Sequence, residues 1–215
     1  MRSSFAYILL ILSGLMSGCD KWYTTEEVSH ISYVPEFEMT DGEFISVLRQ
    51  DSVDFEDPGV VASADGMPLT VYARGSVDLS EVGVYLIEYF AENEDGLVGK
   101  AERIIAVTNN DVSNNDLSGI YSGTLWDPVE SKVKKINEKG LYECEDVLGF
   151  PGFMIEGRFV DLGQNELVLL HGDGFFGRYG NSEGTYTRST LSWTVFLLDP
   201  PYEGVELPVL WRKKN

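Results

Sequence analysis

Only a few residues of this chain combine side-chain types and spacing that could do chemistry. The two histidines, His30 and His171, have no second histidine and no cysteine close to them in the sequence. Because zinc is held by several such ligands, we expect neither a metal nor another cofactor. Cys144 lies in a short strand-like segment and is predicted to pack as a small hydrophobic residue. A catalytic thiol, with a partner from elsewhere in the fold, is the less favoured alternative.

Carboxylates are the other chemically capable group. Asp57, Asp78 and Asp95 could gather around calcium, although aspartate is commoner in turns than on metals. A carboxylate pair could also hydrolyse a glycoside. The chain has 35 acidic residues, however, so such a pair can be drawn almost anywhere. We therefore expect no enzymatic activity, and a small hydrolase is the alternative.

Aromatic residues give a stronger indication of binding. The glycines of the segment Gly172–Gly180 predict a loop, and loops on a rigid scaffold are where binding residues collect. The alternative is a hairpin whose two phenylalanines fold back into the core. Trp126, two residues before Pro128, and Tyr202, directly after Pro201, lie in two other predicted loops. The predicted ligand-binding residues are aromatic or cationic and lie in these loops: Phe175, Phe176, Arg178, Tyr179, Trp126 and Tyr202.

These side chains must be positioned by strands, because helical periodicity is almost absent from the sequence. In the region 35–109 the clearest strand is Val84–Ala91, which places Tyr85, Ile87 and Tyr89 on one face. Turn sequences rich in Asp, Pro and Gly separate it from further short strands. This spacing predicts an antiparallel sandwich.

A second strand-rich region follows a short polar run. Residues 110–116 are predicted to be a linker by composition. Residues 117–215 contain further alternating segments, and we expect a second antiparallel β domain, either a sandwich or a meander barrel. Trp193 alternates with Val195 and Leu197 on one strand face and is predicted to lie in its core.

An ordered series of motifs in the first region resembles the immunoglobulin-like repeat that was first named from a pesticidal crystal protein and is abundant in bacterial surface proteins. The resemblance implies an immunoglobulin-like sandwich over 35–109 that acts as a spacer or interaction module, with no catalytic residues to carry over. The motifs are, in order, Phe55–Val60, Val77–Asp78, Gly83–Tyr89, Asp95–Gly96, and then Arg103, Ile105 and Val107.

The first residues have the pattern of an export signal. Arg2 is followed by an apolar stretch, Phe5–Met16, that is too short to span a bilayer. The stretch ends in Leu15–Cys19, which resembles the bacterial lipobox. This resemblance implies a signal peptide at 1–18, lipid attachment to Cys19 and a lipidated tether at 19–34. An ordinary signal peptide with a chance cysteine is the alternative.

Short motifs in the second region resemble the C-terminal domains of lipoproteins encoded beside Sus-type nutrient importers of Bacteroidetes. They are Leu117–Tyr121, Gly140–Tyr142 and Asp146–Gly149. The resemblance implies two protein partners, an outer-membrane transporter and its lid lipoprotein. It also implies an outer-membrane location, and acidic residues close to Cys19 favour the cell surface.

The net charge of −19 argues against binding to nucleic acid or anionic lipid, because both need basic patches. We therefore expect a non-catalytic outer-membrane lipoprotein that helps a Sus-type importer to bind an oligosaccharide. The alternatives are an accessory subunit of a peptide importer and a structural subunit that docks on the transporter without binding a nutrient.

Overall fold

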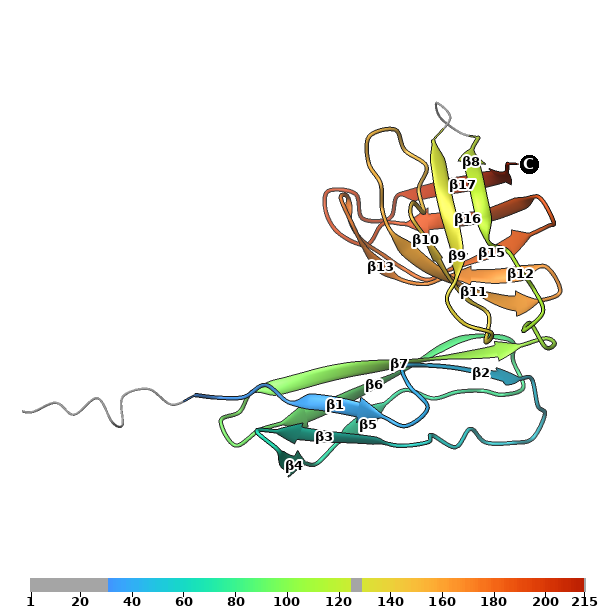
Figure 1. Ribbon diagram of the computed structural model, residues 1–215. Helices are drawn as coiled ribbons and strands as arrows, with labels where there is room; N and C mark the ends of the chain where they lie inside the picture. The colour runs from blue at the N-terminus through green and yellow to red at the C-terminus, as the bar shows by residue number, and fades with distance from the viewer. Residues whose placement is uncertain (1–30, 125–128, 215) are drawn as a thin grey trace, which may run out of the picture. The chain divides into compact units, whose positions relative to one another are not determined.

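The computed structural model describes residues 31–124 and 129–214, and Tyr33–Asn215 form one compact unit. The elements in these residues are all β-strands (Figure 1), arranged as a sandwich and a barrel, which confirms the predicted fold class. Over these two ranges, no helix is long and apolar enough to cross a membrane. Two of the predicted functional residues, Cys19 and Trp126, lie outside the described residues.

The first region consists of two sheets. One sheet has the order β1–β3–β4 and the other has the order β2–β7–β6–β5. The strands are β1 (Glu36–Met39), β2 (Phe44–Leu48), β3 (Val60–Ala64), β4 (Met67–Leu69), β5 (Tyr72–Arg74), β6 (Gly83–Glu92) and β7 (Val98–Thr108). The expectation of a purely antiparallel sandwich is wrong at one pair, because β2 runs parallel to β7. These two strands are far apart in sequence, so no hairpin fixes their relative direction.

The core of the sandwich follows the predicted alternation along β6. Ile87 and Tyr89 are buried, Tyr85 packs beside them, and Ile105 of β7 completes the same cluster. Residues of β1 and β3 cover this face from the other sheet. The alternating pattern therefore identified the inward face of β6 correctly.

An ion pair between a buried arginine and a partly exposed aspartate holds the sandwich. The guanidinium of Arg103 is fully buried, and its Nη1 donates to Oδ1 of Asp57 at 2.5 Å. Its Nη2 donates to the carbonyl oxygens of Thr40 at 2.9 Å and Gly59 at 3.1 Å. The hydroxyl of Tyr89 also donates to Asp57. Asp57 is thus an acceptor for Arg103 and Tyr89, which accounts for its place in the motif without a metal.

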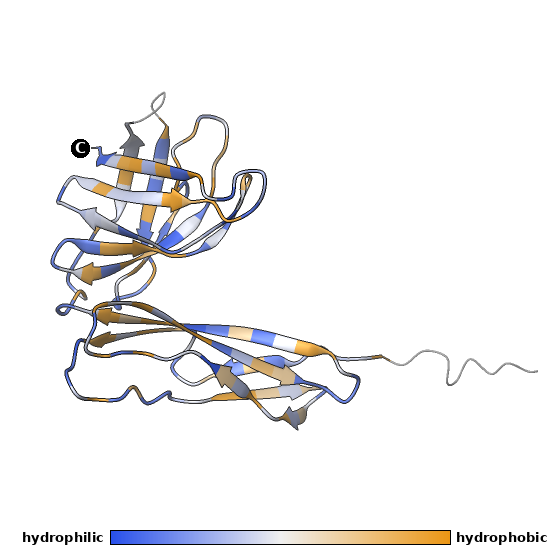
Figure 2. Cartoon of the chain, turned by 180° about the vertical axis from the view of Figure 1, so that it is seen from behind, coloured by the Kyte–Doolittle hydropathy of each residue, from blue (hydrophilic) through white to orange (hydrophobic). Residues whose placement is uncertain are grey.

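The opposite face of β6 and β7 is apolar as well. Ile104 and Ala106 are buried, and Val84 and Leu86 pack beside them. Their partners are outward-facing residues of the barrel wall: Leu141, Val160, Leu162, Val168 and Leu170. Figure 2 shows hydrophobic and hydrophilic segments alternating along the strands of both regions. This second cluster joins sandwich and barrel through apolar contact.

The second region is a closed meander barrel. Its strands pair in the order β8–β9–β10–β11–β12–β15–β16–β17, and β17 returns to β8 through the pair Trp211 and Gly123. The strands are β8 (Gly119–Gly123), β9 (Glu130–Lys135), β10 (Leu141–Cys144), β11 (Gly157–Gly163), β12 (Glu166–Leu169), β15 (Ser182–Tyr186), β16 (Thr190–Phe196) and β17 (Glu206–Lys213). A separate hairpin, β13 (Gly172–Gly174) and β14 (Gly177–Tyr179), is inserted between β12 and β15.

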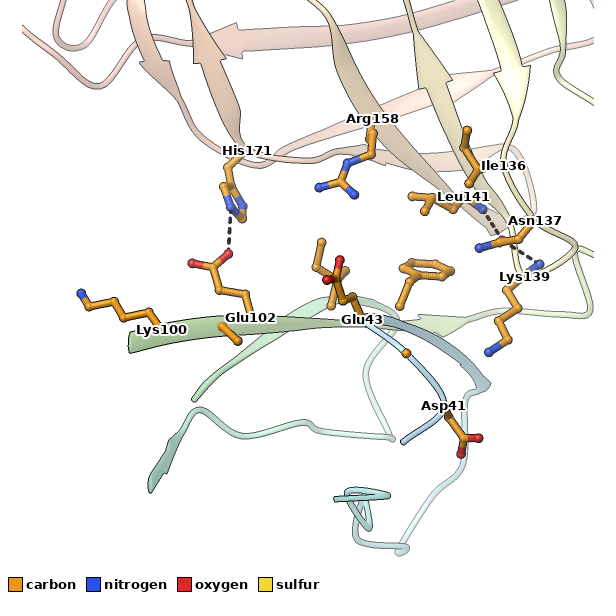
Figure 3. Close-up of a pocket in the computed structure, with 14 residues that line it drawn as sticks. Asp41, Glu43, Lys100, Glu102, Ile136, Asn137, Lys139, Leu141, Arg158 and His171 are labelled. Atoms are coloured by element: carbon orange, nitrogen blue, oxygen red, sulfur yellow. Dashed lines mark hydrogen bonds and ion pairs between the residues drawn. The ribbon is translucent and has the colours of Figure 1, made fainter. Parts of the chain in front are cut away.

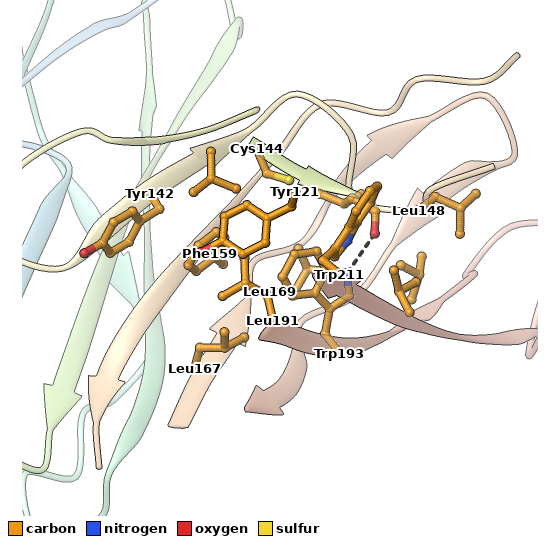
Figure 4. Packing of buried hydrophobic residues seen from close by; sticks show 14 of the residues in the cluster. Tyr121, Tyr142, Cys144, Leu148, Phe159, Leu167, Leu169, Leu191, Trp193 and Trp211 are labelled. Carbon is orange, nitrogen blue, oxygen red and sulfur yellow. Dashed lines mark hydrogen bonds between the residues drawn. The ribbon is translucent and has the colours of Figure 1, made fainter. Parts of the chain in front are cut away.

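Large side chains pack inside the barrel (Figure 4). Trp193 and Trp211 are both buried, and Nε1 of Trp193 donates to the carbonyl of Val147 at 2.7 Å. The rings of Tyr142 and Phe159 stack with 5.1 Å between their centroids. The prediction that Trp193 is a core residue is confirmed. These residues leave the barrel with a solid interior, as expected for a small eight-stranded barrel.

The segment 109–118 packs against one end of the barrel. Asn115 donates to the carboxylate of Asp161 at 2.7 Å and accepts from the hydroxyl of Tyr142 at 2.8 Å. Val112 and Leu117 are buried. The predicted linker, residues 110–116, therefore packs against the barrel.

Replacing Arg103 by methionine should lower the free energy of unfolding by about 3 kcal/mol, because Asp57 loses its counter-charge and the carbonyls of Thr40 and Gly59 lose a charged donor. Urea unfolding followed by circular dichroism measures this loss. Arg74→Met is the matched control, because the Arg74–Glu88 pair is exposed and such pairs contribute less than about 1 kcal/mol. Equal losses in the two variants would contradict a stabilising role for the Arg103–Asp57 pair.

Candidate functional site at the aromatic end of the barrel

Connections in a meander barrel alternate between its two ends. The three longest described connections, residues 145–156, 170–181 and 197–205, therefore lie at the same end. The connections at the other end are short turns, and the segment 109–118 packs there. We call the end that carries the three long connections the aromatic end. It carries Phe175, Phe176, Arg178 and Tyr202 of the predicted ligand-binding residues.

A buried carboxylate shapes the first of these connections. Asp146 accepts hydrogen bonds from the backbone N–H groups of Leu148 at 3.0 Å, Gly149 at 3.1 Å and Ile155 at 3.4 Å. Burial raises the pKa of this carboxyl, and the three backbone hydrogen bonds oppose that shift. The side chain of Asp146 thus ties both ends of the loop that presents Phe150 and Phe153.

The hairpin β13–β14 covers part of this end. Tyr179 is buried, and its hydroxyl donates to the carbonyl of Glu156 at 3.2 Å. Burial raises the pKa of Tyr179 to about 12. A Cβ atom at Gly157 or Gly172 would clash with this hydroxyl, so both glycines make room for the ring. The prediction that Tyr179 contacts a ligand is wrong, because its ring belongs to the core.

Arg178 is held by an acidic neighbour. Its backbone N–H donates to Oδ2 of Asp199 at 2.8 Å, and its Nη2 lies 2.7 Å from Oδ1 of the same carboxylate. The side-chain hydrogen bond from Arg178 lowers the pKa of Asp199. This pair joins the hairpin to the connection 197–205. The guanidinium predicted to contact a ligand is 64% exposed and also joins these two connections.

Five rings gather at the aromatic end. Phe175 lies 5.2 Å from Phe176 with an interplanar angle of 89°, and Phe176 lies 5.4 Å from Tyr202, also at 89°. Phe153 lies 4.5 Å from Phe175 and is tilted by 42°. Phe150 packs edge-on against Phe176. Edge-to-face and tilted pairs of this kind are favourable for isolated ring clusters, but they present no flat double platform.

The two phenylalanines of the predicted loop differ in exposure. Phe175 is 70% exposed, whereas Phe176 packs against the barrel core. The sequence left open whether both rings are exposed or both are folded inward, and each alternative holds for one ring. Tyr202 is 42% exposed. The rings of Phe175 and Tyr202 both pack against Phe176, so their exposed parts belong to one apolar patch. Such patches are typical of interaction sites.

A cleft of about 230 Å³ opens beside three of the five rings, those of Phe150, Phe176 and Tyr202. Apart from the hydroxyl of Tyr202, its walls are hydrocarbon side chains: Leu148, Phe150, Phe176, Leu197, Tyr202, Val205 and Leu207. Small-molecule sites have about 300–1,000 Å³ and a few placed polar groups. This cleft is smaller and lacks such groups. It fits a single apolar side chain better than a sugar.

A second, larger hollow lies elsewhere on the same unit. It has a volume of about 860 Å³, and side chains of both charges, including Glu43, Glu102, Arg158 and His171, point toward it (Figure 3). Nε2 of His171 lies 3.4 Å from Oε2 of Glu102, and both side chains are close to half exposed. Exposed pairs attract weakly. None of the predicted ligand-binding residues lines this hollow, so we place the candidate site at the aromatic end.

The sequence contains two glycine patterns that also occur in catalytic or nucleotide-binding motifs. Their structural context here differs from the one that those motifs require. Gly180–Gly184 has the spacing Gly-x-Ser-x-Gly, and Gly172–Gly177 has the spacing Gly-x-Gly-x-x-Gly. Both patterns act where a strand turns into a helix. Here the first enters strand β15, where Ser182 is buried, and the second is the β13–β14 hairpin.

Cys144 packs as the sequence predicts. It is buried inside the barrel, where burial raises the pKa of its thiol to about 12. Its Sγ donates to the carbonyl of Asp146 at 2.9 Å. The thiolate that nucleophilic chemistry needs is therefore scarce at neutral pH. Over the described ranges, no cluster of three or more metal-ligating residues occurs.

Comparison with known proteins identifies the class of the first domain. Residues 45–107 match the family model described as "Bacterial surface protein, Ig-like domain". The match lies inside the predicted region 35–109 and confirms its immunoglobulin-like character. The first domain is therefore immunoglobulin-like, and its sequence is similar to that of the bacterial surface domain.

Among solved structures, the crystal structure of the lipoprotein BT2262 from Bacteroides thetaiotaomicron is similar to this chain. The alignment covers 83% of this chain and 100% of that chain, with 22% sequence identity and a TM-score of 0.37. A TM-score at this level supports no argument about function. No curated protein matches the sequence significantly.

Replacing Asp146 by alanine should lower the free energy of unfolding by about 3 kcal/mol, because three buried N–H groups lose a charged acceptor. Hydrogen exchange should also speed up at Leu148, Gly149 and Ile155. Asp111→Ala is the control, because Asp111 caps the N–H of Ser113 at the surface, and its loss should cost less than about 1 kcal/mol. Unchanged exchange in the loop would show that Asp146 does not hold it.

Proposed function

We propose that this chain is a non-catalytic lipoprotein of the bacterial cell envelope that binds a protein partner through the aromatic end of its barrel. Cys19 is the anchor, as the lipobox resemblance implies. The immunoglobulin-like domain links the anchor segment to the barrel. The observation that carries the proposal is the exposed Phe175 beside an apolar cleft of about 230 Å³.

The ring geometry favours a protein partner over the oligosaccharide that the sequence first suggested. A sugar stacks on flat rings that lie side by side in one groove. Phe175, Phe176 and Tyr202 are instead perpendicular to their neighbours. Exposed apolar patches rimmed by polar residues are typical of protein–protein contact, and aromatic anchors supply most of the binding energy there.

The partner we propose is the transporter or the lid lipoprotein of a Sus-type complex in the outer membrane. The short motifs at Leu117–Tyr121, Gly140–Tyr142 and Asp146–Gly149 support this choice through their resemblance to such accessory lipoproteins. The match of residues 45–107 to a bacterial surface domain is consistent with an envelope location. In this role the chain is a docking subunit, one of the alternatives that the sequence left open.

The anchor is tested by replacing Cys19 with serine. The variant should lose its acyl chains and leave the membrane fraction almost completely, because several chains are needed for stable attachment. Fractionation with a labelled fatty acid measures both effects. Cys144→Ser is the control and should stay on the membrane, because Cys144 is enclosed in the barrel. A Cys19→Ser variant that still carries lipid would contradict the assignment.

The docking surface is tested by Phe175→Ala and Tyr202→Ala in the lipidated protein. Each should reduce the amount of transporter that co-purifies from native membranes by about tenfold or more, because a central aromatic anchor contributes about 2 kcal/mol. Quantitative mass spectrometry of the purified complex measures the loss.

The matched control is Tyr72→Ala, which removes a ring that is 66% exposed on β5 of the sandwich. Co-purification should be unchanged in this variant. If Phe175→Ala and Tyr72→Ala behave alike, the aromatic end is not the docking surface. If Phe175→Ala instead abolishes binding on a glycan array, the oligosaccharide function replaces the proposal.

A further inference from the structure

The hollow of about 860 Å³ is lined by residues of both the sandwich and the barrel, and its charges are balanced. The lining contains three acidic and three basic side chains besides His171, whereas the whole chain has 35 acidic and 16 basic residues. The hollow is therefore much less acidic than the protein as a whole. The six charged residues are Asp41, Glu43, Glu102, Lys100, Lys139 and Arg158.

The two walls of the hollow differ in charge. All three acidic residues of the lining belong to the sandwich, whereas Lys139 and Arg158 belong to the barrel. Arg158 of β11 and Glu43, which directly precedes β2, point into the hollow from these two walls (Figure 3). A ligand that lies between the walls can therefore contact a guanidinium on one side and a carboxylate on the other.

Most of these charges have no counter-charge within reach. Among the described residues, the one ion pair inside the lining joins His171 to Glu102 at 3.4 Å. Arg158, Lys139 and Glu43 take part in no ion pair over the same residues, and all three are exposed. The hollow thus presents opposite charges that face the same space and do not neutralise each other.

Part of the lining is apolar. Phe44, Ile104 and Leu141 line the hollow and also belong to the hydrophobic cluster that joins the sandwich to the barrel. The volume of about 860 Å³ lies within the range of about 300–1,000 Å³ that small-molecule sites occupy. Apolar surface beside two opposite charges suits a ligand that carries both charges and a hydrocarbon group.

We propose that this hollow binds a short zwitterionic peptide, with its α-carboxylate against Arg158, its α-ammonium group against Glu43 and an apolar side chain against Phe44 and Ile104. A guanidinium suits this role because its planar fork can donate two parallel hydrogen bonds to a carboxylate. The inference goes beyond the proposed function, because none of the residues assigned to the docking surface lines the hollow.

Other ligand classes fit the same lining less well. A purely anionic ligand is repelled by the three carboxylates, and a purely cationic ligand by the three basic groups. A zwitterionic lipid headgroup such as phosphocholine can pair with both walls, but it has no side chain to cover Phe44 and Ile104. A neutral oligosaccharide would cover charged groups without neutralising them.

The test is isothermal titration calorimetry of the full lipidated protein with a tripeptide that has a central leucine flanked by alanines. The peptide is used in three forms: with both ends free, with an acetylated N-terminus and with an amidated C-terminus. The free form should bind, and each capped form should bind about tenfold more weakly, because it loses one charged hydrogen-bonding partner. Phosphocholine should bind more weakly than the free peptide.

Two variants assign each end of the peptide to its wall. Arg158→Met should weaken binding of the free peptide about tenfold and leave binding of the amidated form unchanged, because that form has no carboxylate to lose. Glu43→Gln should likewise weaken the free form and leave the acetylated form unchanged. Arg212→Met is the matched control, because it removes an exposed arginine from β17 outside the hollow, and it should change neither titration.

Three results would overturn the inference: no measurable binding of the free peptide, equal binding of its three forms, or equal weakening by Arg158→Met and Arg212→Met. Tighter binding of phosphocholine than of the free peptide would overturn it in favour of a lipid headgroup. Phe175→Ala should leave the peptide titration unchanged, so the docking surface and the peptide site stand or fall separately.

Discussion

The solid interior of the barrel is the constraint on which the arrangement of this protein depends. An eight-stranded barrel encloses just enough space for its own side chains, and here Trp193, Trp211 and their neighbours pack in it. Contact with another molecule must therefore occur on a wall or at an end. The wall formed by β10–β12 packs against the sandwich, and the segment 109–118 packs at one end. The aromatic end and the walls formed by the remaining strands are the barrel surfaces that these contacts leave available.

Much of the fold could be predicted from sequence because alternation is a local signal. The inward face of β6, with Ile87 and Tyr89, and the core position of Trp193 followed from period-two patterns. The second apolar face of β6 and β7 did not follow. Ile104 and Ala106 alternate with Ile105 and Val107, so the run is apolar throughout, and such a run gives no sign of which face meets which partner. The partner is the barrel wall, which is distant in sequence.

The candidate site was predictable by composition but not residue by residue. The glycines and rings of residues 172–180 indicated one of the three long connections at the aromatic end. The fate of each ring depends on neighbours that approach from other connections: Gly157 admits the hydroxyl of Tyr179 into the core, and Asp199 engages Arg178. These contacts join residues more than 20 positions apart, so no local pattern encodes them. Asp146, which holds the first connection, stands out in the sequence only as part of the motif Asp146–Gly149.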